Sequence, residues 1–419
     1  MRILLLSHYY WPEIGAPQRR WSSLIHQLIS RGHDVVVAAP HPHYPHSCRE
    51  EFFQSKVGNR WSRLETKLGG TWDTGENGER IIRVPYLHSG HSMARQMLDQ
   101  GVAATGAVGA VVRRMRGTNR PDVVVSTTPA LPFLFAGDLV ARALKVPHVA
   151  EVRDAWPDLI RDLSLVTSAS GGILPNPFAK YLEERALPDY LTSIQRRASA
   201  VVVTTESFRA QLRQRGVKAE VVRSGVNQAE IDQARHDPFG QPGEANLLYV
   251  GTVGRSQDLA SAVIATSRVP GINLRIVGNG AGQASLQSLA SSLGAPVAFF
   301  EQAVGAELSD HWAWADAGLV SLGDVPSHAL TVPSKLYSLM VRQVTVLGIA
   351  RGEAADIITE NGAGIIAAPG DIDSIVTAMQ SLVQNVARPE GMARQWVIDN
   401  ASVGVMAEKY ERILRQVCT

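Results

Sequence analysis

The first 40 residues of the chain read MRILLLSHYYWPEIGAPQRRWSSLIHQLISRGHDVVVAAP. Residues 2–7 form a near-continuous apolar run, which is typical of a buried parallel strand. After a loop with proline and glycine, apolar side chains fall on one helical face: Trp21, Leu24, Ile25, Leu28 and Ile29. Gly32 ends this predicted helix, and residues 34–39 form the next buried strand. This strand–helix–strand unit predicts a Rossmann-like sheet.

The alternation of strands and helices continues through the first half of the chain. Apolar runs predict strands at 123–127, 148–152 and 200–204, and a helix at 134–144. Residues 41–83 are poor in such a pattern and rich in proline, glycine and charge. We interpret this segment as a long functional loop.

A second run of strands and helices begins after residues 240–243. It predicts strands at 247–250, 274–277, 297–300, 318–322, 344–349 and 364–367. Two successive runs predict an α/β protein with two doubly wound domains, at 1–225 and 226–400, whose ligands bind at the carboxyl ends of the strands and in the cleft between domains. A charged amphipathic helix within 401–419 is expected to pack across their interface.

The composition favours a soluble, core-forming protein. The chain has 419 residues, with 45% hydrophobic and 19% charged residues, and only two cysteines. No run approaches the roughly 18 apolar residues of a membrane span. The basic residues are dispersed and only 6% of residues are aromatic, which argues against nucleic-acid binding. We therefore expect a cytoplasmic protein with no nucleic-acid partner.

The charge is distributed unevenly along the chain. Residues 1–199 hold 24 Lys+Arg and 18 Asp+Glu, a net +6, whereas the remainder has a net −4, so that the total is +2. A basic front half would suit anionic lipid or a phosphate-bearing acceptor. The Ala/Val/Gly-rich segment 102–116, which ends in arginines, could lie on the inner face of a membrane. A buried domain helix with a basic end explains it equally well.

The first domain offers candidate residues at two strand ends. Gly15 lies before the first helix, where backbone amides can bind an anion, and we assign it to donor binding. Arg19 and Arg20 follow in the first turn, where cations oppose the helix dipole and so hint at a bound anion. With Glu13 they are candidate acceptor-binding residues, although Glu13 also fits a solvated loop acid.

Arg153 and Asp154 follow the predicted strand at 148–152. This is the edge of the sheet where catalytic groups are expected. Arg153 could hold a phosphate, and Asp154 could accept a hydrogen bond or a proton from a sugar hydroxyl. The alternative is an internal Arg–Asp pair that steadies the loop.

The second domain offers a candidate donor site. Gly251, Gly254 and Arg255 follow its first strand, where glycines permit a tight turn beneath a pyrophosphate and Arg255 could neutralise it. Asn279 and Gly280 end the next strand, although both residue types also favour ordinary turns. Ser334, a plausible N-cap, begins a helix whose amides at Ser334, Lys335 and Leu336 could bind phosphate.

The histidines near the N-terminus do not have the spacing of a metal site. His8, His41, His43 and His46 are irregularly spaced, and no acidic residue lies between His41 and His46. We therefore expect no metal and no other bound cofactor. A single catalytic histidine among them remains an alternative.

These residues together resemble the retaining GT-B glycosyltransferases of glycosyltransferase family 4, in the branch that builds bacterial surface polysaccharides and lipid-linked glycans. The similarity runs in order over nearly the whole chain. It rests on short motifs at 9–13, 31–35, 43–45, 153–157, 224–227, 249–251, 277–280 and 332–337.

The resemblance implies a hexosyltransferase with a GT-B fold. Its first domain would bind a glycan or lipid-linked acceptor, and its second a nucleotide-sugar donor, for which we expect a UDP-sugar. The anomeric configuration would be retained without a metal, because amides and basic side chains neutralise the diphosphate. The mechanism commonly proposed for this fold is front-face attack, in which the leaving phosphate takes the acceptor proton.

The chain departs from the family at the donor site. Leu330 and Ser338 stand where the family has two glutamates, and Ser338 could still bind a ribose through its hydroxyl. Thr252 and Ser256 stand where it has an arginine and a lysine, with Arg255 displaced by one residue. These departures leave two alternatives open: a catalytically silent homologue that binds another transferase, and a GT-B-fold epimerase.

Overall fold

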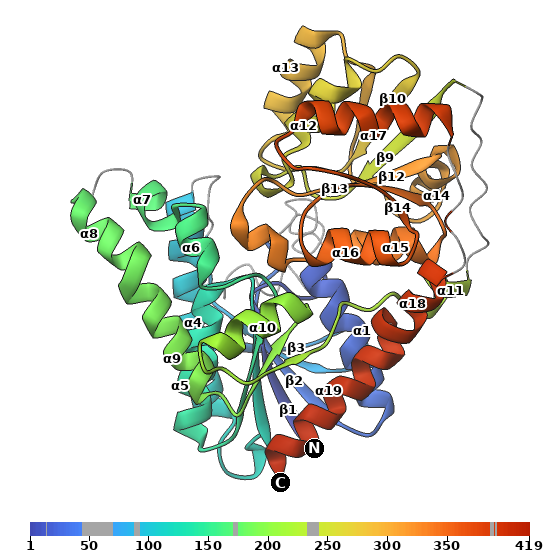
Figure 1. Cartoon of the computed structure of the whole chain (residues 1–419). Helices are drawn as coiled ribbons and strands as arrows, with labels where there is room; N and C mark the ends of the chain where they lie inside the picture. Colours follow the sequence, from blue (N-terminus) through green and yellow to red (C-terminus); the bar gives the residue numbers. More distant parts are fainter. Residues whose placement is uncertain are drawn as a thin grey trace. The chain divides into compact units, whose positions relative to one another are not determined.

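The computed structural model describes residues 1–13, 15–43, 70–87, 93–170, 175–232, 243–385, 389 and 392–419 (Figure 1). The chain forms two compact units. The first contains Met1–Ser224 and Val403–Thr419, and the second contains Gly225–Ser402. Each unit is built on its own sheet, so the α/β class with two doubly wound domains is confirmed.

The first unit contains an eight-stranded sheet in the order β3-β4-β2-β1-β5-β6-β7-β8. All neighbouring pairs are parallel except β3 and β4. The strands are β1 (Arg2–Leu6), β2 (Asp34–Pro40), β3 (Thr71–Thr74), β4 (Arg80–Val84), β5 (Val123–Thr127), β6 (His148–Val152), β7 (Ala200–Val203) and β8 (Ala219–Val221).

Helices cover both faces of this sheet. They are α1 (Ala16–Ser30), α4 (Met93–Arg114), η1 (Gly117–Asn119), α5 (Leu131–Leu144), α6 (Asp158–Asp162), α7 (Leu165–Ser170), α8 (Asn176–Tyr181), η2 (Leu182–Ala186), α9 (Leu187–Arg197), α10 (Glu206–Gln214) and α19 (Val403–Cys418).

The continuous apolar run of β1 follows from this two-sided cover. Ile3 and Leu5 belong to the core beneath α1 and α19, which lie alongside each other (Figure 1). Leu4 and Leu6 belong to the opposite core, beneath α4 and α5. Because both faces are buried, alternate residues need not be polar, and the strand reads as one hydrophobic run.

The second unit contains a six-stranded parallel sheet in the order β11-β10-β9-β12-β13-β14. Numbered along the unit, this is the order 3-2-1-4-5-6 of a doubly wound dinucleotide-binding sheet. The strands are β9 (Ala245–Val250), β10 (Ile272–Val277), β11 (Val297–Phe300), β12 (Ala317–Ser321), β13 (Thr345–Ile349) and β14 (Gly364–Ala367).

The helices of the second unit pack on both faces of its sheet. They are α11 (Gln228–Asp232), η3 (Arg255–Gln257), α12 (Leu259–Thr266), α13 (Gln283–Leu293), α14 (Gly305–Trp314), η4 (Pro326–Leu330), α15 (Ser334–Val341), α16 (Glu353–Glu360), α17 (Ile372–Gln384) and α18 (Met392–Ala401). Gly294 ends α13 in the left-handed conformation, with φ of 58°, as the sequence predicts.

The prediction of a single long loop at 41–83 is wrong in part. Residues 71–74 and 80–84 pair as the antiparallel strands β3 and β4 at the edge of the first sheet. Residues 44–69 lie outside the described part of the chain. The edge strand β3 has an alternating, half-exposed pattern, and four residues are too few for that pattern to stand out in the sequence.

Helices α4 and α19 both pack within the first unit. In α4 the small apolar residues Ala103, Ala107 and Ala110 are fully buried against the sheet, so their composition reflects packing, and membrane contact stays a prediction. The terminal helix α19 buries Met406, Tyr410 and other apolar residues in the first unit's core. Among the described helices, none is long and apolar enough to cross a membrane.

Candidate functional site

Two glycine-containing loops lie at the carboxyl edge of the second sheet, beside the switch in strand order between β9 and β12. The loop after β9 and the loop after β10 are joined by backbone hydrogen bonds. The Val253 amide donates to the Asn279 carbonyl at 3.0 Å, and the Gly282 amide donates to the Val253 carbonyl at 3.0 Å. The two loops therefore form one rigid floor at this edge.

The glycines of these two loops are required for different structural reasons. A Cβ on Gly280 would collide with the Val253 carbonyl oxygen, so Gly280 is needed for the close contact between the loops. Gly251 has a φ of +145° and faces Lys335, whose Nζ would lie 2.9 Å from an added Cβ. Here glycine permits both an unusual backbone conformation and the approach of a basic side chain.

Lys335 is the most unusual charged group of this edge. Its Nζ lies 3.6 Å from the centroid of the Tyr249 ring. In the described part of the chain, no carboxylate lies within ion-pair distance of this nitrogen. Burial lowers the pKa of Lys335 to about 7. The structure thus holds a basic group against an aromatic face with no acid beside it, which suits an incoming anion.

The start of α15 differs from the prediction. The N-cap is Pro333 and not Ser334, and no side chain caps the helix. The Leu336 amide donates to the Pro333 carbonyl at 3.0 Å, and the Leu336 side chain is fully buried. Of the three predicted anion-binding amides, those of Ser334 and Lys335 remain without an intrahelical acceptor, and the amide of Leu336 does not.

Ser338 is engaged by a residue that sequence reasoning missed. Its Oγ donates to Glu230 Oε1 at 3.0 Å, and Arg342 forms an ion pair with the same oxygen at 3.1 Å. Glu230 also caps α11, where it exchanges hydrogen bonds with Asn227. That Asn-x-x-Glu pattern predicts a helix start, but the pattern carries no sign of the contact with Ser338.

The remaining predicted donor residues are only partly free. The Gly254 amide donates to Gln257 Oε1 at 3.1 Å. Asn279 has a buried Oδ1 with no hydrogen-bond partner among the described residues, so it could accept a hydrogen bond from a ligand. The side chain of Arg255 lies outside the described residues.

In the first unit, Arg20 is built into the fold. Its guanidinium donates to Glu151 Oε1 at 2.8 and 3.0 Å, and to the carbonyls of Val222 and Arg223 at 2.9 and 2.8 Å. Glu151 is fully buried and also accepts from Trp21 and Thr127. The predicted role of Arg20 in acceptor binding therefore finds no support, because its N–H groups are used inside the unit.

The other predicted residues near α1 are divided between interior and surface. Glu13 is buried, and its carboxylate accepts the amide N–H groups of Tyr10 and His43 at 3.1 and 2.8 Å, so it is not a solvated loop acid. Gly15 is the N-cap of α1, in an extended conformation with φ of −167°. Arg19 is exposed, its amide donates to the Gly15 carbonyl at 2.9 Å, and no hydrogen bond of its guanidinium is found within the described residues.

Arg153 and Asp154 follow β6 at the carboxyl edge of the first sheet. The Arg153 amide donates to Thr128 Oγ1 at 3.0 Å, and its carbonyl accepts from Thr204 Oγ1 at 3.1 Å. The backbone is thereby fixed on both sides. Arg153 Nε is nevertheless buried, and no hydrogen-bond partner for it is found in the described part of the chain. Burial lowers the pKa of Arg153. Asp154, half-buried, is the next residue.

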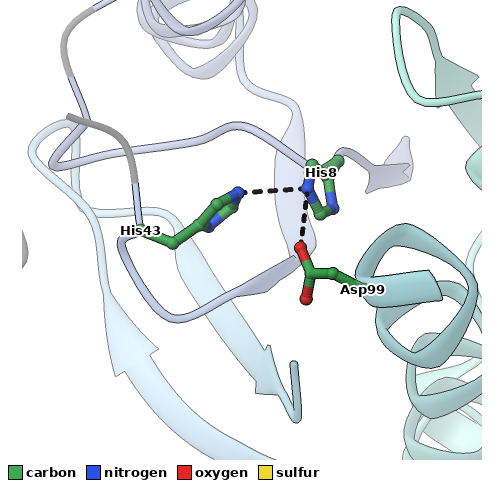
Figure 2. Close-up of side chains that lie close together, drawn as sticks. All are labelled: His8, His43 and Asp99. Carbon is green, nitrogen blue, oxygen red and sulfur yellow. Dashed lines mark hydrogen bonds and ion pairs between the residues drawn. The ribbon is translucent and has the colours of Figure 1, made fainter. Parts of the chain in front are cut away.

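Three residues that the sequence did not connect come together in the first unit. His8 follows β1, His43 follows β2 and Asp99 lies on α4, and Figure 2 shows their side chains directed toward one another. Burial and then the charge of His43 lower the pKa of His8. Burial acts to lower the pKa of His43, but Glu13, the His41 carbonyl and Asp99 together outweigh it, and the pKa is raised.

Comparison with known proteins places both halves of the chain. Residues 15–224 match the model of the glycosyl transferase 4-like domain, and residues 244–385 match that of glycosyl transferases group 1. An Escherichia coli (strain K12) protein named as a colanic acid biosynthesis glycosyl transferase, WcaI, is 24% identical over 308 residues, 70% of each chain.

Solved structures share the whole fold. Sucrose-phosphate synthase from Thermosynechococcus elongatus aligns with a TM-score of 0.72 and 15% identity, over 99% of this chain and 98% of that one. Anabaena HepE, in complex with UDP and glucose, aligns with a TM-score of 0.66 and 13% identity, over 99% and 100% of the chains. With half of its length matched by one family model, this chain belongs to the glycosyl transferase 4-like family and is a glycosyltransferase with the GT-B fold.

Proposed function

We propose that this enzyme transfers a hexose from a UDP-sugar to a glycan or lipid-linked acceptor of the bacterial cell envelope, with retention of anomeric configuration. The colanic acid assignment of the E. coli relative supports the pathway class. The complexes of HepE with UDP and with UDP-glucose support the donor class. The closest chemical support comes from the chain itself.

The observation that carries the proposal is Lys335 at the carboxyl edge of the second sheet, with which no described carboxylate forms an ion pair. A diphosphate placed there would meet the Lys335 ammonium and the amides of Ser334 and Lys335 at the start of α15. Charge-assisted hydrogen bonds of this kind are about twice as strong as neutral ones. They become stronger as the donor bond breaks, because negative charge then collects on the leaving phosphate.

In the proposed reaction an acceptor hydroxyl attacks the anomeric carbon from the face that the diphosphate leaves. The bond between the anomeric carbon and the diphosphate oxygen breaks, a bond to the acceptor oxygen forms, and the leaving phosphate takes the hydroxyl proton. Lys335 balances the charge of the leaving group in this scheme, which needs no metal there. Arg153 and Asp154 are the proposed catalytic groups of the first unit, with Arg19 available to an anionic acceptor.

A second candidate function is a silent homologue that binds a partner transferase. The contact of Ser338 with Glu230 favours it, because the hydroxyl expected near the ribose is already engaged. Nucleotide binding with no turnover of any sugar nucleotide would favour this second candidate.

The first experiment measures thermal unfolding with UDP, GDP and dTDP. A nucleotide at about 100 times its dissociation constant should stabilise the protein by roughly 2.7 kcal/mol. We expect UDP to raise the melting temperature of the wild type clearly more than that of Lys335→Met. Lys180→Met, at an exposed position on α8 of the first unit, is the matched control and should respond as the wild type does.

Turnover is then measured with the UDP-sugars, and the anomeric configuration of the product is read by NMR. Retained configuration is the expected result. If no nucleotide shifts the melting temperature, the donor site that we propose is wrong.

A further inference from the structure

The cluster of His8, His43 and Asp99 takes no part in the proposed reaction. Its three side chains come from three separate segments: the end of β1, the residues after β2, and helix α4 (Figure 2). Nε2 of His8 lies 3.0 Å from Nε2 of His43 and 3.5 Å from Oδ2 of Asp99. The side chains of His8 and Asp99 are each 2% exposed, and that of His43 is 11% exposed.

One hydrogen cannot join all three of these atoms in short hydrogen bonds. Nε2 of His8 faces both a ring nitrogen and a carboxylate oxygen, yet it carries at most one hydrogen. If His43 donates to it, the ionised Asp99 oxygen faces a nitrogen lone pair. If it donates to the lone pair of neutral His43 at 3.0 Å instead, the Asp99 oxygen at 3.5 Å is left beyond good hydrogen-bond distance.

A cation accepts all three lone pairs at once. Zn²⁺ binds imidazole nitrogen and carboxylate oxygen at about 2.0–2.2 Å, so its ligands lie roughly 3.0–3.6 Å apart for angles between 90° and 109°. The two measured separations, 3.0 and 3.5 Å, fall in that range. All three ligand atoms lie within 4.8 Å of one another.

The groups behind these atoms hold them in place as metal ligands are usually held. Nδ1 of His43 lies 3.0 Å from Glu13 Oε1 and 3.0 Å from the His41 carbonyl oxygen. Oδ1 of Asp99 accepts the Leu87 amide at 2.8 Å. A histidine ligand almost always donates its other ring N–H to a carboxylate or carbonyl, which fixes its tautomer and raises its basicity.

We propose that His8, His43 and Asp99 form a binding site for one divalent cation of zinc type, which joins β1, the residues after β2 and helix α4. Two imidazoles and one carboxylate suit Zn²⁺, Co²⁺ and similar borderline cations better than Mg²⁺ or Ca²⁺, which prefer oxygen ligands. Three protein ligands leave at least one coordination position for water or another oxygen. This site lies in the first unit and is distinct from the Lys335 site of the second.

The expectation of no metal was based on spacing along the chain, which does not show that these three side chains lie together. The fold brings His8 and His43 together through parallel strands, and it adds Asp99 from a helix beyond both. No local sequence motif indicates that these three residues lie close together.

The experiment uses the full chain, treated with EDTA, desalted and titrated with Co²⁺ and Zn²⁺ in the absence of nucleotide. We expect one Co²⁺ per chain with visible d–d absorption, displaced by one equivalent of Zn²⁺. Because nucleotide is absent, the outcome is independent of the proposed donor site.

Variants locate the cation. His43→Gln and Asp99→Asn should each weaken Co²⁺ binding by more than about 100-fold, since even loss of an outer hydrogen-bond partner costs roughly 10–100-fold. Glu13→Gln removes only such an outer partner, so it should weaken Co²⁺ binding by roughly 10–100-fold. His26→Gln, at an exposed histidine on α1, is the matched control and should bind as the wild type does.

Absence of stoichiometric Co²⁺ binding to the wild type would overturn the proposal, whatever the variants do. Unchanged affinity in a folded His43→Gln variant, judged by circular dichroism, would also overturn it.

Discussion

The carboxyl edges of the two sheets use charge in opposite ways. In the first unit, Arg20 and Glu151 are paired, buried and fully hydrogen-bonded within the fold. In the second unit, Lys335 lies against the Tyr249 ring and no described carboxylate pairs with it. A paired charge tells us which segments it holds together, whereas an unpaired charge tells us that a ligand of opposite sign is expected.

The same contrast separates the glycines. Gly280 is required by the contact between two loops, since a Cβ there would meet the Val253 carbonyl. Gly15 has an extended backbone, and an added Cβ would meet only Pro17 Cδ at 3.6 Å. Packing explains the first glycine and does not explain the second, so Gly15 is the better candidate for contact with a ligand.

The largest expected effect is on the paired charges. Glu151→Ala removes the acceptor of Arg20, Trp21 and Thr127 and leaves the Arg20 guanidinium buried without its counter-ion. Removing one partner of a buried ion pair costs about 3–5 kcal/mol of unfolding free energy. Urea unfolding followed by circular dichroism measures this loss. If Glu151→Ala is as stable as the wild type, the paired charges of the first unit do not hold its segments together as we infer.

Arg153 differs from Arg20 in the first unit, because its buried Nε has no hydrogen-bond partner within the described residues. We expect Arg153→Met to lower kcat by roughly 10²–10³, the effect of losing one group that stabilises transition-state charge. The unfolding free energy should change far less than in Glu151→Ala. Initial rates of UDP release and urea unfolding test both parts. A large loss of stability with unchanged kcat would make Arg153 structural.

The pH dependence of donor binding should follow Lys335. Its pKa of about 7 in the free protein must rise when a diphosphate lies beside it, so binding takes up a proton. UDP affinity should therefore be constant below pH 7 and fall by up to about tenfold per pH unit above it. Titration calorimetry across pH 6–9 measures this slope. Lys335→Met should show no such fall, and a wild type with no fall would contradict the assignment.

The smallest effect on stability is expected at Gly15. Because there is room for a methyl group and the backbone is extended, Gly15→Ala should cost no more than about 1 kcal/mol of unfolding free energy, the size of an ordinary N-cap substitution. It should still lower kcat/KM if the backbone approaches the donor there. Thermal unfolding and initial rates are compared in the same preparation. Unchanged activity would remove Gly15 from the site.

The regular parts of the fold were predictable because their signals are local. Strands β5, β6, β11 and β14 occur at the predicted residues, since each is a short apolar run bounded by residues that favour turns or helix ends. The edge strand β3 was missed, because its pattern is short and half-exposed. Local signals thus recover the two sheets but not every strand at their edges.

The candidate sites were predictable only in part. Lys335 was found because a basic residue at a helix start is locally unfavourable. The contact of Ser338 with Glu230 joins residues 108 positions apart, and the meeting of His8 with Asp99 depends on the packing of α4. Neither contact can be predicted from the residues that are adjacent in the sequence. Equally, nothing local showed that Arg20, next to the exposed Arg19, would be buried against Glu151.

The central claim is that the unpaired Lys335 marks the donor site, and titration calorimetry of UDP at pH 7 tests it most directly. The account predicts one UDP site in the wild type and in Lys180→Met. In Lys335→Met the affinity should be about 10–150-fold weaker, since hydrogen bonds to charged groups contribute roughly 1.5–3 kcal/mol. Equal affinity in a folded Lys335→Met variant would contradict the account.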